Sequence, residues 1–384
     1  MVRPLVLLML LASIASTAGA QIGKSVSVAA GTDEDKALSE IYAAPDGPAK
    51  IALLDKFMTD FGKGDLELLG DQLYEQSYLA QKNYAKVYEY GEKALKLDAG
   101  NFSTVVNLIH AADEQGDAQK VFNYGEMAAG ILARFKSAPP PAGTPPEQWP
   151  SQQKQALADA QPDITYVQFA MVNAAQKTTN AAARAALLER FVAAFPDSAY
   201  APTVRDQIAF SHQQAQNPAK MIETAQANLA ADPNDVSMLV LLADYWSESG
   251  QQLDKAAAIA QKALDVLAKA QKPENVTDEQ WQRQVSIQKG LAYSSLGQVY
   301  VNKTQNPQAV DAFKQASPLL KSDTVSYARN LYRLGFTLAK MQRIPEARVA
   351  LTEAVSLNTP YKSRAQETLD KIGGSAKKPA RKSS

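Results

Sequence analysis

The feature that most constrains this chain is a repeat with a period of about 34 residues. The segment Lys86–Ala94 (KVYEYGEKA) returns thirty-four positions later as Lys120–Ala128 (KVFNYGEMA), and the stretches that begin near Ala201 and Asp235 have nearly the same spacing. Such a period is typical of helix-hairpin units, each of which buries its apolar side only against its neighbours. The repeat therefore predicts an all-α array in place of a single globular core.

Two units near the C-terminus carry a full set of small and large apolar residues in the same order. The sets are Tyr293, Leu296, Gly297, Tyr300, Ala309, Phe313 and Ala316, and then Leu331, Leu334, Gly335, Leu338, Ala347, Leu351 and Ala354. This pattern resembles the tetratricopeptide repeat (TPR) family, and the resemblance extends over roughly Asp33 to Ile372. It implies a right-handed superhelical solenoid of stacked antiparallel helix hairpins. Small residues would let paired helices approach closely, and large ones would fill the seams between them.

A longer periodicity indicates that the array is duplicated. Ala52–Phe57 (ALLDKF) corresponds to Ala186–Phe191 (ALLERF), and each half carries an irregular insertion that ends in Glu-Gln-Trp. We expect the following organisation: a linker at 21–32; a first half at 33–182 with a Pro-rich insertion at 137–148; and a second half at 183–372 with an insertion at 271–280 and its strongest repeats at 290–322 and 328–360.

Each insertion is predicted to end at an unusually long helix. Thr144 and Thr277 stand three residues before Glu147 and Gln280, which is the spacing of a helix capping box. The preceding helix should overrun its unit, as the apolar run through Phe135 suggests in the first half. Trp149 and Trp281 then have two interpretations, since each can be a packed staple for this overhang or an exposed binding anchor; burial is the commoner fate.

The N-terminus has the pattern of a cleaved secretory signal peptide over residues 1–20. Arg3 supplies a positive charge, Leu5–Ala12 is too short to span a bilayer, and Ala18-Gly19-Ala20 fits a signal-peptidase site. We expect export of a chain that begins at Gln21, to the periplasm or the exterior of a bacterial cell. No cysteine is present, so this is not a lipoprotein. The basic tail at 373–384 should be disordered, either as a plain solubilising terminus or as a weak tether to an anionic envelope polymer.

Composition argues against most chemistry. The 40 basic residues balance the 40 acidic ones, so no overall field attracts nucleic acid, and the absence of cysteine removes thiolate chemistry. The two histidines, His110 and His212, are too distant in a repeat array to share a site easily. His212 takes an aromatic position of its repeat and is expected to be packed. We expect no catalytic residue, no metal, no cofactor and no enzymatic activity.

The concave groove of stacked hairpins is the expected binding surface, and the resemblance places specific residues along it. They are Asn107, His110, Asp113, Asp206, Phe210, Asp244, Gln298, Asn302, Arg329, Tyr332, Arg333 and Phe336. Arg329 and Arg333 resemble half of a clamp that holds a terminal carboxylate in some family members. The lysine and asparagine that would complete that clamp are replaced, so chaperone-type clamping is not supported.

These patterns predict an exported interaction scaffold that binds a peptide segment or a protein partner in the groove. The alternative is a module that binds cell-wall polymer or glycan, for which the two inserted tryptophans would provide stacking surfaces. An enzyme ranks last, because no nucleophile, base and orienting group can be assembled from these residues.

Overall fold

The computed structural model describes residues 22–274 and 276–373, and this part of the chain contains eighteen α-helices and no strand. The predicted all-α class is therefore confirmed. The signal-peptide prediction at 1–20 and the basic tail beyond Gly373 lie outside the described residues. The chain divides between Ala215 and Gln216 into two compact units. The predicted division at 182/183 was drawn from matching repeats and not from compact units, so it stays a prediction.

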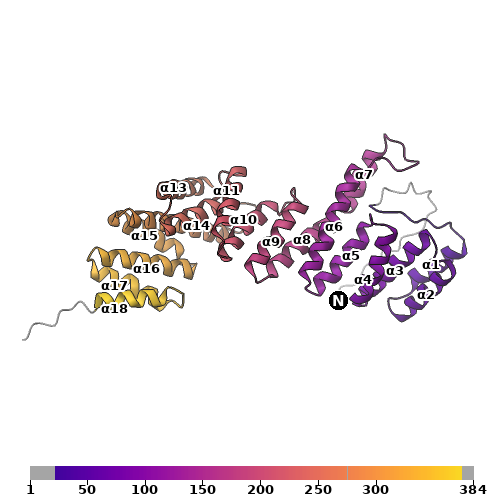
Figure 1. Cartoon of the computed structure of the whole chain (residues 1–384), viewed down its shortest axis with the longest axis horizontal. Helices are drawn as coiled ribbons and strands as arrows, with labels where there is room; N and C mark the ends of the chain where they lie inside the picture. Colours follow the sequence, from indigo (N-terminus) through magenta and orange to yellow (C-terminus); the bar gives the residue numbers. More distant parts are fainter. Residues whose placement is uncertain (1–21, 275, 374–384) are drawn as a thin grey trace, which may run out of the picture. The chain divides into compact units, whose positions relative to one another are not determined.

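The first unit is built from ten helices, which follow one another as antiparallel hairpins with one inserted helix, α7 (Figure 1). Their bounds are α1 Asp33–Ala43, α2 Pro48–Phe61, α3 Asp65–Ala80, α4 Tyr84–Leu97, α5 Phe102–Glu114, α6 Ala118–Ser137, α7 Trp149–Asp159, α8 Gln161–Lys177, α9 Ala181–Ala194 and α10 Ala201–Gln214.

The second unit contains the remaining eight helices and ends in a single helix that packs on the last hairpin. Their bounds are α11 Pro218–Ala231, α12 Val236–Ser249, α13 Leu253–Lys269, α14 Asp278–Asn302, α15 Asn306–Leu320, α16 Thr324–Lys340, α17 Ile344–Ser356 and α18 Lys362–Gly373. The two strongest predicted repeats correspond to the hairpins α14–α15 and α16–α17.

Glycines of the repeat motif lie where the two helices of a hairpin touch. A methyl group on Gly297 would come within 2.5 Å of the Phe313 ring, and one on Gly335 would come within 2.5 Å of Leu351 Cγ. Both large partners are fully buried. The motif thus fixes the distance between paired helices, because a side chain at either glycine would force the hairpin apart.

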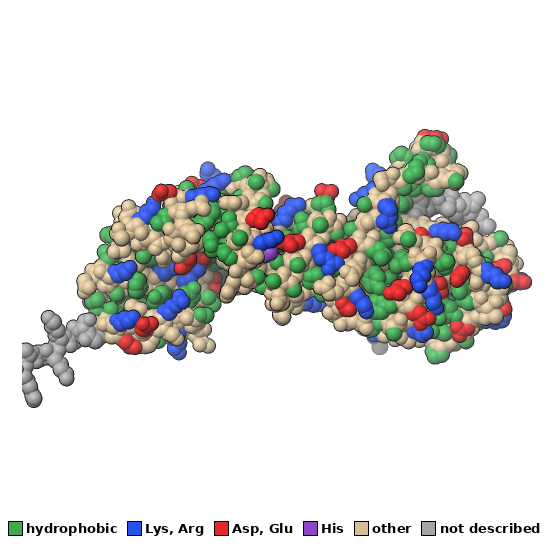
Figure 2. All heavy atoms as spheres, in the orientation of Figure 1, with side chains coloured by type: hydrophobic (Ala, Val, Ile, Leu, Met, Phe, Trp, Pro, Cys, Tyr) green, Lys and Arg blue, Asp and Glu red, His purple; other side chains and the backbone are tan. Residues whose placement is uncertain are grey.

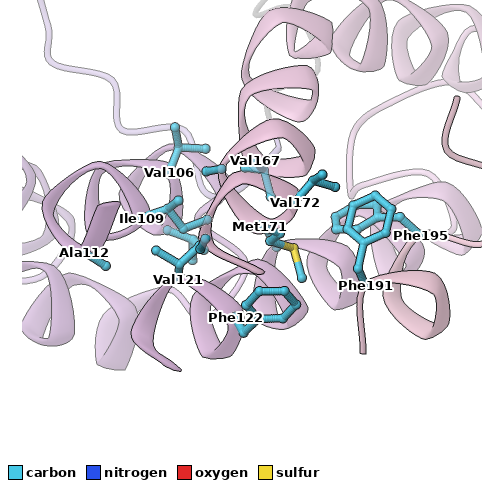
Figure 3. Close-up of a cluster of buried hydrophobic side chains, with 14 of the residues drawn as sticks. Val106, Ile109, Ala112, Val121, Phe122, Val167, Met171, Val172, Phe191 and Phe195 are labelled. Atoms are coloured by element: carbon cyan, nitrogen blue, oxygen red, sulfur yellow. The ribbon is translucent and has the colours of Figure 1, made fainter. Parts of the chain in front are cut away.

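The largest apolar cluster of the first unit extends over the helices from α5 to α10 (Figure 3). Met171 from α8 lies among Phe122 from α6 and Phe191 from α9, and all three are fully buried. This cluster continues through the repeats without a break at the insertion. The first unit is therefore held together by packing between neighbouring repeats.

The two inserted loops end differently. Thr277 forms the predicted capping box with Gln280 and starts α14, which is 25 residues long. The prediction for Thr144 is wrong, since Thr144 lies in the loop and α7 begins at Trp149. Pro146 explains the difference, because a proline disfavours the helical conformation of the residue before it. The expected long helix is also interrupted at Ala160, two residues before Pro162.

Trp149 is a packed staple. Its side chain is buried at the start of α7, its ring meets Phe135 edge-on at 5.7 Å between centroids, and its Nε1–H donates to the Ala138 carbonyl at 2.8 Å. The predicted overrun of the preceding helix is confirmed, since α6 continues to Ser137. Trp149 thereby ties the start of α7 to the end of α6, and α7 projects from the first unit (Figure 1). Trp281 is only half-buried.

Replacing Trp149 with phenylalanine should cost about 1 kcal/mol of unfolding free energy, because the ring contact is kept while one buried hydrogen bond is lost. Urea denaturation followed by circular dichroism measures the change. Trp281→Phe is the matched control, since no hydrogen bond from its ring to another described residue is found. Equal losses in the two variants would contradict the staple.

An extended strap at residues 22–31 crosses the first unit before α1. Ile22 is buried against the apolar cluster at α5, and its carbonyl accepts from the Phe102 amide at 3.4 Å. Lys24 donates its amide to Asp98 at 2.7 Å and places its ammonium 2.5 Å from Asp65. The expected linker is thus an ordered part of the fold.

Candidate functional site

A concavity of about 430 Å³ opens on the second unit. It is lined from four helices and the turn before the last of them: Glu248 of α12; Gln298 and Val301 of α14; Arg329, Tyr332, Arg333, Phe336 and Thr337 of α16; Tyr361 of the turn; and Arg364 of α18. Its size suits one or two peptide side chains and not a whole folded domain.

Helix α16 supplies half of this lining because of its periodicity. Its pocket residues follow the pattern i, i+3, i+4, i+7, i+8 from Arg329 to Thr337, so they share one face of the helix. Leu331, Leu334 and Leu338 point to the hairpin core instead. Asp323 starts the helix by accepting a hydrogen bond from the Ser326 amide. The core face therefore fixes which side chains reach the concavity.

An ionic network forms the back of the concavity. Arg329 Nη1 lies 2.8 Å from Asp244 Oδ2, and Arg333 Nη2 lies 3.6 Å from Asp244 Oδ1 and pairs with Glu248. Arg333 also donates to Ser294 Oγ at 2.9 Å. Burial alone would raise the pKa of Asp244, but the two guanidinium groups outweigh it and lower that pKa. The network keeps Asp244 ionised at neutral pH.

Three aromatic rings form the open side. The Tyr332 ring centroid lies 6.1 Å from Phe336 and 6.4 Å from Tyr361. Phe336 is 37% exposed, and the Lys340 ammonium lies 4.9 Å from its ring centroid. Aromatic and arginine side chains together are the residue types that dominate binding energy at protein interfaces. The concavity thus presents a contact surface of mixed apolar and cationic character.

The structure brings five of the predicted groove residues together here: Gln298, Arg329, Tyr332, Arg333 and Phe336. Asp244 lies behind them as their counter-ion, and Asn302 donates to the Ser247 carbonyl at 2.6 Å while accepting from Gln298. Sequence reasoning missed Glu248, Tyr361 and Arg364. The last two follow the final full repeat, although Arg364 lies in the first turn of α18, whose apolar residues continue the same spacing.

The predicted residues of α5 lie in the first unit and are engaged with their neighbours. Asn107 donates to Glu75 Oε2 at 3.1 Å, His110 stacks on Tyr166 at 3.8 Å between ring centroids, and Asp113 lies 3.8 Å from Lys177. Burial lowers the pKa of His110. The partner residues on α3 and α8 were not predicted.

Two further predicted residues, Asp206 and Phe210, lie about one turn apart on α10, and Phe210 is 37% exposed. Helix α8 contacts α5 and reaches α10 through a hydrogen bond from Gln176 to Gln207 at 3.5 Å. His212 is buried, as expected for a packed position, with its Nε2 3.0 Å from Glu189 Oε1.

Glu75 is the most unusual titratable group of the first unit. Its side chain is fully buried between α3, α4 and α5, and Oε1 has no hydrogen-bond partner among the described residues. Burial raises the pKa of Glu75 to about 8, against the opposing effect of the hydrogen bond from Asn107. The carboxyl group is therefore mostly protonated at neutral pH.

The face shown in Figure 2 carries basic and acidic side chains in alternation over each unit. Within residues 22–274 and 276–373, no group of three or more histidine, aspartate or glutamate side chains is placed to hold a metal ion. In the same residues, no helix has both the length and the apolar character that a membrane crossing requires.

No protein-family model and no curated protein matches the chain. Solved structures similar to it include the APC/C hetero-tetramer Cut9–Hcn1, with 13% identity and a TM-score of 0.43 over 88% of this chain and 62% of that chain. Yeast Tom70 matches with 12% identity and a TM-score of 0.41 over 91% of this chain and 66% of that chain. NprR in complex with its cognate peptide NprX matches with 12% identity and a TM-score of 0.30 over 89% and 82%.

The chain thus spans less than two thirds of the length of the Cut9–Hcn1 and Tom70 chains. The architecture itself is read from the helices: motif glycines face large partners inside each hairpin, and successive hairpins share continuous apolar clusters. Each of the two units is an all-α array of stacked helix hairpins, as the repeat predicts.

Proposed function

We propose that this protein is an exported, non-catalytic interaction scaffold and that it binds a peptide segment or protein partner in the concavity of the second unit. The observation that carries the proposal is the cluster of Arg329, Tyr332, Arg333 and Phe336 around an open volume of about 430 Å³. Helical-hairpin arrays serve in general as scaffolds for protein interaction. The concavity adds a specific place for contact.

Site-specific photo-crosslinking in intact cells tests the proposal. A photoreactive phenylalanine analogue replaces Phe336, whose ring is 37% exposed at the concavity, or Val349, which is 70% exposed on α17 and does not line it. We expect a discrete partner from position 336 and none from position 349. The purified partner should then bind the wild type and lose about tenfold or more in affinity to Phe336→Ala.

Capture of the same partner from both positions, or equal binding by Phe336→Ala, would place the interaction elsewhere. N-terminal sequencing of the recovered chain tests export in the same sample. A chain that begins at Gln21 in the envelope fraction is the expected result, and an intact Met1 in the cytoplasm would contradict it.

The alternative, a binding module for wall polymer or glycan, has weaker support. It depends on the two inserted tryptophans as stacking surfaces, and Trp149 is buried in its contact with Phe135. Half-buried Trp281 remains open to a ligand. Sedimentation with purified wall material separates the two functions. The alternative requires that the wild type sediments with the wall material and that Trp281→Ala does not.

A further inference from the structure

Glu248 has an unusual position at the concavity, because it combines exposure with a buried partner. Its side chain is 49% exposed at the rim, whereas the Arg333 side chain with which it pairs is only 6% exposed. Asp244, the other partner of Arg333, is 15% exposed and is also held by Arg329. Glu248 is therefore the carboxylate that can leave the network without opening the core.

We propose that Glu248 occupies, in the free protein, the position of a carboxylate from the partner, and that the concavity takes a peptide segment in which an aspartate or glutamate adjoins an aromatic side chain. This inference rests on the function proposed above. Exchange of one carboxylate for another keeps two carboxylates on Arg333, whereas departure of Glu248 alone would leave this buried guanidinium only its longer, 3.6 Å contact with Asp244. An incoming amide or hydroxyl would not replace the lost ion pair.

The charges around the concavity favour an acidic segment. The lining holds three guanidinium groups, from Arg329, Arg333 and Arg364, and the two carboxylates in contact with them belong to Asp244 and Glu248. Arg364 is exposed and forms no ion pair with another residue of the described chain. When a partner carboxylate replaces Glu248, Arg364 is available for a second acidic group, because a guanidinium fork suits that anion.

The apolar half of the segment is indicated by the rings. Tyr332 lies between the other two along the open side, with its ring centroid 6.1 Å from that of Phe336 and 6.4 Å from that of Tyr361. A side chain placed against them buries apolar surface beside the guanidinium groups, and an aromatic one gains ring contacts in addition. One acidic and one aromatic side chain in sequence match the two halves of the lining.

Binding of synthetic hexapeptides to the full-length protein tests the proposal. The probes are acetylated and amidated peptides with one aspartate beside one phenylalanine in a glycine-serine background, together with versions that carry asparagine for aspartate or alanine for phenylalanine. We expect the parent peptide to bind at least about tenfold more tightly than either version in fluorescence polarisation. The affinity should fall as salt is raised.

Variants of the protein give the sharper result. Glu248→Gln should bind the parent peptide several-fold more tightly than the wild type, since the built-in competitor is gone, and Arg364→Gln should bind it more weakly. The matched controls are Glu279→Gln and Arg348→Gln, exposed positions that do not line the concavity. Circular dichroism confirms that each variant is folded. A gain of affinity distinguishes competition from a structural effect, which would only weaken binding.

Three outcomes would overturn the inference: equal affinity for the aspartate and asparagine peptides, no gain with Glu248→Gln, or binding that requires a free C-terminal carboxylate. If position 336 still captures a protein partner in cells, such a result removes the acidic-aromatic specificity and leaves the scaffold function in place. If none of the peptides binds and position 336 captures no partner in cells, both proposals fail.

Discussion

Replacing Asp244 with alanine should lower the unfolding free energy of the second unit by about 3–5 kcal/mol, because it leaves two largely buried guanidinium groups without their shared counter-ion. Urea denaturation measures this in a Trp149→Phe background, where the remaining tryptophans, Trp246 and Trp281, both report on the second unit. Asp254→Ala is the control: Asp254 pairs with Lys303 but is 97% exposed, so its loss should leave the unfolding free energy almost unchanged.

The pH dependence of the Asp244→Ala effect has a definite sign. The pKa of Asp244 is lower in the folded than in the unfolded chain, so its contribution is present above the unfolded value and is lost as pH falls through the folded value. The difference between wild type and variant should therefore be constant near neutrality and shrink only in acid. Comparable losses for Asp254→Ala, or a difference that grows in acid, would contradict the network.

Replacing Glu75 with glutamine should stabilise the first unit, and increasingly so as pH rises. Folding raises the pKa of Glu75 from 4.5 to about 8, so the folded chain retains a proton that the unfolded chain releases. In the wild type, the contribution of Glu75 to the unfolding free energy therefore falls as pH rises from 4.5 to about 8. Glutamine resembles the protonated form and does not titrate. The gain should be a few kcal/mol above pH 8, with a ceiling of about 5 kcal/mol set by the shift.

Denaturation curves of wild type and Glu75→Gln at several pH values test this. The two proteins should differ by less than about 1 kcal/mol near pH 4.5 and diverge toward pH 8. Burial also raises the pKa of Asp71, to about 6. Asp71 affects the wild type and the variant alike, so it does not contribute to the difference in their stability. Glu67→Gln, an exposed position on the same helix, should leave the curves superimposed. Parallel curves for Glu75→Gln would show that the carboxylate is solvated.

The repeat motif was sufficient to predict the hairpins and much of their packing. Gly297 and Phe313 stand at motif positions that meet by local geometry, so their contact follows once the family pattern is recognised. The second-unit groove residues were found in the same way, since a helix that buries one face necessarily presents the other. Local periodicity carries this information because each repeat touches only its neighbours.

Contacts between side chains of distant repeats could not be predicted from the sequence. Arg329 and Asp244 are 85 positions apart, and no local pattern joins them; the sequence showed two candidate ligand-binding side chains where the fold has an ion pair. Tyr166 was missed because the prolines before and within the α7–α8 region obscure the register of its helix. Glu75 was missed because a lone glutamate in a helix is ordinarily exposed, and only the packing of Gly91 against it reveals its burial.

The strap at residues 22–31 imposes an order on folding. A chain made from its N-terminus presents Ile22 early, yet the strap docks on residues that follow much later, since Lys24 and Asp98 are 74 positions apart. The strap must therefore wait for α5 before it can settle. Local hairpins can close in sequence as they appear, whereas this long-range closure comes late. The strap can therefore dock only after the chain from α3 to the start of α5 has formed its surface.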